Sequence, residues 1–280
     1  MSKIGAHVSA AGGLYHAPEN AVAEQLETFQ MFSRPPQSFK CPPLDDAAVE
    51  TFRQAVKAAG FTSYYIHAPY LISLASVKPT LRYGSITMLK QELDRGSRLG
   101  VRGVMFHTGS AASQPDRATG IKVAIDSLNK VLDGYKGSCL LLLENAAGGG
   151  SVLGCTFEEL AQLYKGIKKN KAKVGFCLDT AHAFGSGYDL RTQAAVNKTI
   201  AEFDAKLGLE HLICIQANDS KVELNSKKDR HEHIGGGQIG AAGFGFLLNH
   251  PKLKRLDFIL ETPFDGRAND VAVLKKLRRS

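Results

Sequence analysis

The sequence predicts a single-domain (β/α)8 barrel that occupies the whole chain, residues 1–280. Two observations lead to this fold. Eight short apolar runs are separated by stretches whose apolar residues recur at helical spacing. The last six runs end at positions 67, 107, 144, 179, 216 and 261, which are 40, 37, 35, 37 and 45 residues apart. One strand and one helix in every ~35–45 residues is typical of this barrel. The alternative, a doubly wound open sheet, needs fewer strands or a second domain.

The eight predicted strands are short apolar runs. In chain order they are Ile4–His7, Thr28–Phe32, Tyr64–His67, Gly103–His107, Cys139–Glu144, Val174–Asp179, His211–Gln216 and Asp257–Glu261.

Helical spacing is clearest in residues 49–59, 121–132 and 157–167. The third of these stretches follows Thr156, and Thr156 with Glu159 matches a capping box. A last helix is predicted near Val271–Arg279, where four cations suit a helix C-terminus.

Composition restricts the class of protein. A chain of 280 residues with 44% hydrophobic content can bury one large core. The net charge of +8 favours a polyanionic partner such as nucleic acid, and an ordinary solvated basic surface is the alternative. The five cysteines form no CxxC pair, and no apolar run approaches the ~20 residues that span a bilayer. We therefore expect a cytoplasmic protein without disulfides and without membrane contact.

Metal-capable side chains end most of the predicted strands. All strand C-termini of a parallel barrel share one face, and active sites lie there. A single His or carboxylate at a strand end is usually a hydrogen-bonded loop anchor, but here five of six ends carry one. The ends of strands three to eight are His67, His107, Glu144, Asp179, Gln216 and Glu261.

Such a cluster predicts bound cations. Several carboxylates in one dry pocket would repel each other and resist ionisation, and cations remove that conflict. Imidazole together with carboxylate suits Zn²⁺ or Mn²⁺ better than Ca²⁺ or Mg²⁺. The candidates outnumber the three or four protein ligands of one catalytic zinc, so we expect more than one metal.

A second cluster, Asp229-Arg-His-Glu-His233, follows the seventh strand. In an extended loop, Asp229 and His231 face the same way, and the loop should lie above the barrel mouth. We expect both to ligate metal, and a solvated charged loop is the alternative. The nearby Gly235-Gly-Gly-Gln-Ile-Gly240 matches G-x-G-x-x-G, but it follows a polar loop and not a strand, which argues against a dinucleotide site.

Seven segments spread along the chain carry a family resemblance. They are Ile4-Gly-Ala-His-Val-Ser-Ala-Ala-Gly-Gly13, Phe106-His-Thr-Gly-Ser110, Leu178-Asp-Thr-Ala-His-Ala-Phe184, Gly187-Tyr-Asp-Leu-Arg-Thr192, Asn218-Asp-Ser-Lys221, Asp229-Arg-His-Glu-His-Ile-Gly235 and Leu260-Glu-Thr-Pro263. Together they resemble endonuclease IV, the metal-dependent apurinic/apyrimidinic endonuclease family of base-excision repair. The resemblance covers essentially the whole chain.

The resemblance implies a barrel with three divalent metals, normally zinc, at its C-terminal face. It implies that His67 and His107 hold one metal. Glu144 would bridge this metal to a second one, which Asp179 and Glu261 complete. The third metal would be held by His182, Asp229 and His231.

The chain departs from the family pattern at Gln216, where the family has a histidine that ligates the second metal. An amide oxygen is a weaker zinc ligand than imidazole, so we predict a weakened second site or one that prefers Mn²⁺. A second departure is Ser33-Arg-Pro-Pro-Gln37, where family members commonly carry an arginine near position 37 that enters the DNA. Arg34 is the candidate to replace it, and loss of the contact is the alternative.

The implied reaction is hydrolysis of the phosphodiester 5′ to an abasic site in double-stranded DNA, leaving a 3′-hydroxyl and a 5′-deoxyribose phosphate. Repair of blocked 3′ ends is expected too. The resemblance also implies that the protein is a monomer. Glu144 would hold two metals, and Glu261 is the candidate to orient or deprotonate water, with plain ligation as the alternative. The resemblance implies that Tyr70 and Leu71 wedge into the DNA, and Lys221 and Arg230 are expected at its phosphates.

Two rival functions remain at this point. Related barrels use His, Glu and Asp metal sites in sugar isomerases and epimerases. The other rival is a lesion-binding protein that Gln216 has weakened in catalysis.

Overall fold

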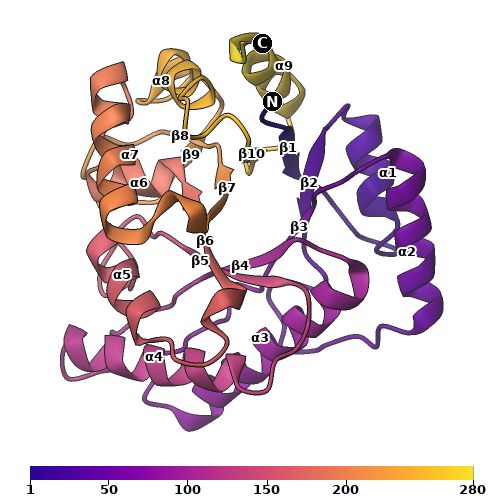
Figure 1. Ribbon diagram of the computed structural model, residues 1–280, viewed down its shortest axis with the longest axis vertical. Helices are drawn as coiled ribbons and strands as arrows, with labels where there is room; N and C mark the ends of the chain where they lie inside the picture. The colour runs from indigo at the N-terminus through magenta and orange to yellow at the C-terminus, as the bar shows by residue number, and fades with distance from the viewer. Residues whose placement is uncertain (280) are drawn as a thin grey trace.

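The eight predicted strands form a closed parallel barrel in the computed structural model, which describes residues 1–279 (Figure 1). Neighbours in sequence are neighbours in the barrel, and β1 closes it by pairing with β10. The predicted (β/α)8 fold is therefore confirmed, with every strand end within one residue of its predicted position. The strands are β1 (Ile4–His7), β2 (Thr28–Met31), β3 (Tyr65–His67), β4 (Gly103–His107), β5 (Leu140–Glu144), β6 (Val174–Asp179), β7 (Leu212–Gln216) and β10 (Asp257–Leu260).

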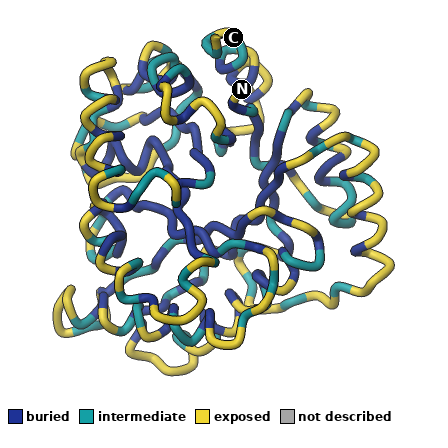
Figure 2. The backbone as a smooth tube through the Cα atoms, viewed as in Figure 1, coloured by how far each residue is buried: buried dark blue, intermediate teal, exposed yellow. Residues whose placement is uncertain are grey.

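Helices surround the barrel, and Figure 2 shows buried backbone at the centre and exposed backbone around it. Five helices begin after a polar cap, Asp45, Asp116, Thr156, Asp179 or Thr192, whose side chain accepts a backbone N–H three residues on. Within residues 1–279 the α-helices are α1 (His16–Ala23), α2 (Asp46–Ala59), α3 (Pro79–Leu99), α4 (Arg117–Leu132), α5 (Phe157–Gly166), α6 (Thr180–Ser186), α7 (Gln193–Leu207), α8 (Gly240–Leu248) and α9 (Arg267–Leu277). Single 3₁₀ turns, Lys171–Lys173 and Leu209–His211, precede β6 and β7.

The helices that the sequence pattern singled out are α2, α4, α5 and α9. The pattern did not single out α3, the longest described helix, because its inner face carries the buried charged residues Glu92 and Arg95. Thr156 caps α5 as predicted, but Glu159 accepts from the N–H groups of Gly154 and Cys155 and not from that of Thr156, as a capping box requires. The capping box is therefore only half formed.

The barrel interior is layered. Tyr65, Met105, Leu142, Cys177, Cys214 and Ile259 form a buried cluster of their own. Each of them lies two positions before one of the predicted site residues, on the same side of its strand. The site residues at the strand ends therefore lie on an apolar floor.

A small hairpin lies in the loop after β7. Its strands, β8 (Asp219–Ser220) and β9 (His231–Glu232), pair antiparallel, with Ser220 opposite His231. The sequence pattern did not predict it. Its pairing fixes the position of the loop that carries Asp229 and His231. Across residues 1–279, none of the helices is both long and apolar enough to cross a membrane.

Candidate metal centre

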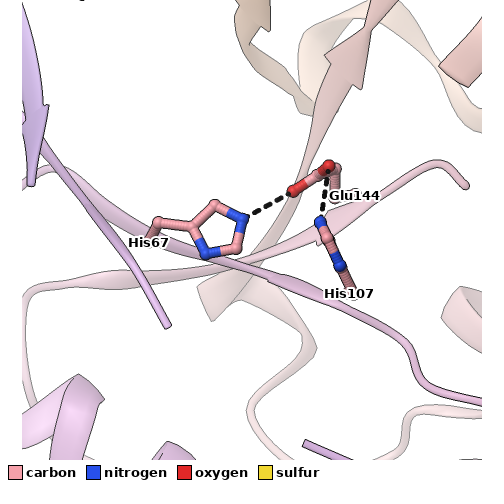
Figure 3. A group of neighbouring side chains, drawn as sticks. All are labelled: His67, His107 and Glu144. Carbon is pink, nitrogen blue, oxygen red and sulfur yellow. Dashed lines mark ion pairs between the residues drawn. The ribbon is translucent and has the colours of Figure 1, made fainter. Parts of the chain in front are cut away.

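His67, His107 and Glu144 meet at the C-terminal ends of β3, β4 and β5 (Figure 3). The Glu144 carboxylate lies between the two rings, 3.3 Å from Nε2 of His67 and 3.2 Å from Nε2 of His107. Glu144 is fully buried, and within residues 1–279 neither of its oxygens has a hydrogen-bond partner. A buried carboxylate without hydrogen bonds is costly unless something else satisfies it.

Asp179, His182, Asp229 and His231 form a second donor group beside the first. Nε2 of His182 lies 3.1 Å from one Asp229 oxygen, and Nε2 of His231 lies 3.2 Å from the other. Asp179 at the end of β6 lies 3.7 Å from Nε2 of His231, and the ligand atoms of Asp179, His182 and His231 lie within 4.8 Å of one another. The hairpin thus brings Asp229 and His231 next to His182, the residue with which the family resemblance groups them.

Backbone carbonyl groups orient two of the imidazoles. Nδ1 of His67 lies 2.6 Å from the carbonyl oxygen of Ala68, and Nδ1 of His182 lies 2.9 Å from that of Asn145. Because a carbonyl only accepts, each Nδ1 carries a proton, and each Nε2 is turned toward a carboxylate, Glu144 for His67 and Asp229 for His182. This is the arrangement in which proteins hold metal-binding histidines.

The pKa values show how strongly these groups depend on each other. Burial alone would raise the pKa of Glu144, but the surrounding imidazoles, His107 above all, hold it well below its usual range. Burial would lower the pKa of His67, but the adjacent Glu144 carboxylate, 3.3 Å from its Nε2, raises it to about 9. Burial would also lower the pKa of His231, but the charge of Asp179 and the contact with Asp229 raise it to about 9. The cluster therefore favours ionised carboxylates, with positive charge between them.

Both donor groups fit divalent cations. Both Glu144 oxygens and Nε2 of His231 are buried without a hydrogen-bond partner in residues 1–279, and each is of an atom type that can bind a metal. Mixed imidazole and carboxylate donors suit Zn²⁺ or Mn²⁺. We call His67, His107, Glu144, Asp179, His182, Asp229 and His231 the donor half of the barrel mouth.

The residues expected around a further cation do not form such a group. Among the described residues, no cluster of three or more His, Cys, Asp or Glu ligand atoms includes Glu261. Gln216 is fully buried, and its amide lies against Cys177, Gln30 and Met105. The side chain of Gln30 in turn bonds Glu261, at 2.5 Å.

Sequence reasoning missed His7 and Gln30. His7 is the last residue of β1, and Gln30 is the last but one of β2. The two residues lie opposite each other in the pairing of these strands. Counting every second residue along the first two strands would have found them, since both point into the barrel. We call His7, Gln30, Gln216 and Glu261 the amide half of the mouth.

Asn218 was missed as well, and it connects the two halves. Its Nδ2 donates to Asp179 at 2.7 Å, and its Oδ1 accepts the backbone N–H of Glu261 at 2.7 Å. The side chain is fully buried. Asn218 therefore holds the ends of β6 and β10 at a fixed separation.

The glycine-rich run after β9 wraps around a carboxylate of the protein itself. Asp219 accepts the backbone N–H groups of Gly235, Gly237, Ile239 and Gly240. A Cβ on Gly237 would lie 2.5 Å from an Asp219 oxygen, so the loop needs glycine there. Its donors are occupied by Asp219, which supports the inference that the run is no dinucleotide site.

His233, the second histidine of the hairpin cluster, has a different partner. Its Nδ1 lies 2.8 Å from the fully buried carboxylate of Asp270 on α9, which also accepts from Thr262 and from the backbone of Ile234. The hydrogen bond to Asp270 raises the pKa of His233. His233 thus fastens the hairpin to α9.

The residues expected at DNA lie in different environments. Tyr70 is 55% exposed, and its ring lies 5.6 Å from the His67 ring and 6.0 Å from the His107 ring. Leu71 is half-buried, whereas Lys221 and Arg230 are exposed on the hairpin. The side chain of Arg34 is 1% exposed and pairs with Glu92 of α3. Arg34 is held inward, because α3 fixes the loop that follows β2 through Glu92 and Gln91.

Comparisons with known proteins agree with this geometry. A family model described as a xylose isomerase-like TIM barrel matches residues 19–279. Proteins named probable endonuclease 4 from Halothermothrix orenii and Campylobacter curvus are 38% and 39% identical to the chain, covering 99% and 100% of it and 99% of each relative. The structure of endonuclease IV from Thermus thermophilus matches with a TM-score of 0.87 at 33% identity over 98% of each chain. A D-tagatose 3-epimerase-like protein, with a TM-score of 0.75 at 17% identity, covers 98% of this chain and 96% of its own and shares the fold alone. The chain belongs to the endonuclease IV family.

Proposed function

We propose that this protein is a DNA-repair endonuclease that hydrolyses the phosphodiester 5′ to abasic sites in double-stranded DNA. The products are a 3′-hydroxyl and a 5′-deoxyribose phosphate, and the same site is proposed to remove blocking groups from 3′ ends. The observation that carries the proposal is Glu144, a buried carboxylate without hydrogen bonds at the barrel mouth. Nε2 of His67 lies 3.3 Å from one Glu144 oxygen, and Nε2 of His107 and Nδ1 of His182 lie 3.2 and 3.1 Å from the other.

Two divalent cations, zinc or manganese, are proposed for the donor half. His67, His107 and Glu144 would hold one, and His182, Asp229 and His231, with Asp179 beside them, would hold the other. Such cations would neutralise the anionic phosphodiester, which otherwise repels an anionic nucleophile. They would also lower the pKa of bound water. The third cation that the family resemblance implies is the one that the geometry supports least.

Glu261 is proposed to orient or deprotonate the attacking water. Its side chain is 16% exposed, so it is reachable from the mouth, and one of its oxygens accepts from Gln30. The backbone N–H of Glu261 is held by Asn218. A carboxylate fixed at two points is suited to a positional role.

Tyr70 is proposed to contact the DNA next to the lesion. An abasic site unstacks easily because it has no base, so an aromatic or apolar side chain can take the empty place. Partial burial of the Tyr70 hydroxyl and the charges of Glu261 and Glu144 raise the pKa of Tyr70 to about 12, so the hydroxyl stays protonated. Lys221 and Arg230 are proposed to bind phosphates, and Arg34, which is buried, is left out of this surface.

The test is incision of a duplex that carries one tetrahydrofuran abasic analogue. We expect a single cut 5′ to the analogue, abolished by a chelator and restored by Zn²⁺ or Mn²⁺. An undamaged duplex of the same sequence is the control substrate. A nicked duplex with a 3′-phosphate tests the 3′-end activity.

Three outcomes separate the candidate functions. Chelator-sensitive cutting supports the endonuclease. Tight binding of the analogue duplex without cutting supports a lesion-binding protein. Absence of both, together with metal-dependent conversion of a ketose, favours the sugar epimerase function.

A further inference from the structure

The amide half of the mouth is a continuous hydrogen-bonded chain. Nε2 of Gln216 donates to Oε1 of Gln30 at 3.4 Å, and Nε2 of Gln30 donates to Oε1 of Glu261 at 2.5 Å. The same Nε2 of Gln30 lies 2.9 Å from Nδ1 of His7. A primary amide nitrogen has two protons, so Gln30 uses both of them, one on Glu261 and one on His7.

Gln216 turns its amide toward the barrel interior. Its oxygen accepts from the thiol of Cys177 at 3.3 Å, and its nitrogen also contacts the sulfur of Met105 at 3.5 Å. Both glutamines are fully buried. Within the described chain, the hydrogen bonds of the Gln216 side chain all go to these interior partners and none to Asp179 or Glu144.

The carboxylates expected to share a further cation already have partners. Asp179 accepts the backbone N–H of His182 at 2.7 Å with one oxygen and Nδ2 of Asn218 at 2.7 Å with the other. Glu261 accepts from Gln30. In the donor half, by contrast, Glu144 and Nε2 of His231 have no hydrogen-bond partner in residues 1–279. The amide half does not fit a cation as the donor half does.

We propose that Gln216 and Gln30 form an amide relay that takes the place of a metal ligand, so that this barrel holds two cations and Glu261 is positioned by hydrogen bonds. In this arrangement Gln216 orients Gln30, and Gln30 fixes the carboxylate of Glu261 toward the mouth. Both glutamines are positioning residues. The statement about cation number stands on the geometry alone, and the statement about Glu261 rests on the proposed function.

Cation number is measured first. The protein is stripped with a chelator, reloaded with excess Zn²⁺ and weighed intact by native mass spectrometry. We expect two zinc ions on the wild type and three on Gln216→His, because imidazole restores the missing ligand. Gln193→His, a glutamine-to-histidine exchange on the exposed start of α7, is the matched control and should keep two.

Three zinc ions on the wild type would overturn the proposal, as would two on a folded Gln216→His. If Gln216→His does not fold, Gln216→Glu is the second variant. It supplies a carboxylate oxygen at the same position and carries the same expectation of three ions.

The relay is measured with Gln30→Leu, which keeps the volume and removes the donor. On the abasic duplex we expect kcat to fall about 10- to 100-fold, as for other groups that orient a reacting residue, with KM and the count of two zinc ions unchanged. Gln54→Leu on the outer face of α2 is the control and should match the wild type. An unchanged kcat, or a lost zinc ion, would contradict the positioning role. Should the wild type cut no abasic DNA, the proposed function fails while the zinc count still decides the cation number.

Discussion

The two halves of the barrel mouth satisfy their buried polar groups in opposite ways. In the donor half, Glu144 and His231 keep ligand atoms without hydrogen-bond partners among residues 1–279. In the amide half, Gln216, Gln30 and Glu261 bond one another. Each unsatisfied buried group costs about 1–3 kcal/mol, so the donor half lowers stability, as groups kept for binding commonly do. The same strand ends thus build a binding site on one side and a support on the other.

The largest expected effect comes from emptying the donor half. Glu144→Gln removes the negative charge that lies between three imidazoles, so both cations lose a shared neighbour. We expect incision of the abasic duplex to fall roughly 10³-fold, the size seen when a main electrostatic group of an active site is removed. Native mass spectrometry should show fewer than two zinc ions, and circular dichroism should show an intact fold. Full activity with two bound zinc ions would remove Glu144 from the metal centre.

A second variant changes the loop that follows β2, the strand that carries Gln30 of the amide half. The loop after β2 is held by a buried pair between Arg34 and Glu92, whose side chains are 1% and 0% exposed, and Ser33 donates to Glu92 at 2.6 Å. Glu92→Gln leaves the Arg34 charge buried without a counter-charge. We expect the free energy of unfolding in urea to fall by about 3 kcal/mol.

The control for this variant lies on the surface next to the same helix. Asp46 pairs with Arg98 of α3 but is fully exposed, so Asp46→Asn should leave the unfolding free energy nearly unchanged. The zinc count should stay at two in both variants. Equal destabilisation by the two substitutions would show that burial of the Arg34–Glu92 pair does not matter.

A smaller effect is expected at the rim that both halves share. Tyr70→Ala removes an exposed ring that lies beside His67 and His107. Stacking against nucleic acid contributes about 1–3 kcal/mol per ring, so we expect Kd for the abasic duplex to rise about 10-fold. Tyr83→Ala, on the exposed face of α3, is the matched control and should bind as the wild type does. Fluorescence anisotropy measures both, and an equal Kd for the two variants would contradict the wedge role of Tyr70.

The smallest expected effect lies away from both halves, where Glu27 ties β1 and β2 to the C-terminus. Burial would raise the pKa of Glu27, but hydrogen bonds from Arg278 and the backbone of Ile4 lower it below 4.5. A lowered pKa adds stability above the unfolded value, and this stability is lost as the pH falls through the folded value. Glu27 is 34% exposed, so solvent screening limits the pair to about 1 kcal/mol.

The test compares Glu27→Gln with the wild type at several pH values. The difference in unfolding free energy should be present at pH 7 and should disappear well below pH 4.5. Glu202→Gln, on the exposed face of α7, should show no such difference. A difference that persists at low pH would mean that packing, and not the charge of Glu27, is responsible.

The sequence by itself determined the barrel and most of the donor half. Buried parallel strands are short apolar runs, and the polar residue that interrupts each run marks its end. This local signal located His67, His107, Glu144 and Asp179 at strand ends. Because all strand ends of a parallel barrel share one face, their proximity followed without any long-range information.

Only the tertiary structure decided how polar groups are paired across the barrel. Gln30 and Glu261 are 231 residues apart, and Arg34 and Glu92 are 58 apart. Their hydrogen bonds depend on register and rotamer, which leave no pattern in neighbouring residues. Arg34 shows the consequence, since its loop suggests a DNA contact while burial against α3 turns it inward. Gln216 shows the other side of this limit: the family resemblance implies that a metal ligand is replaced there, and only the fold shows which hydrogen bonds its amide makes.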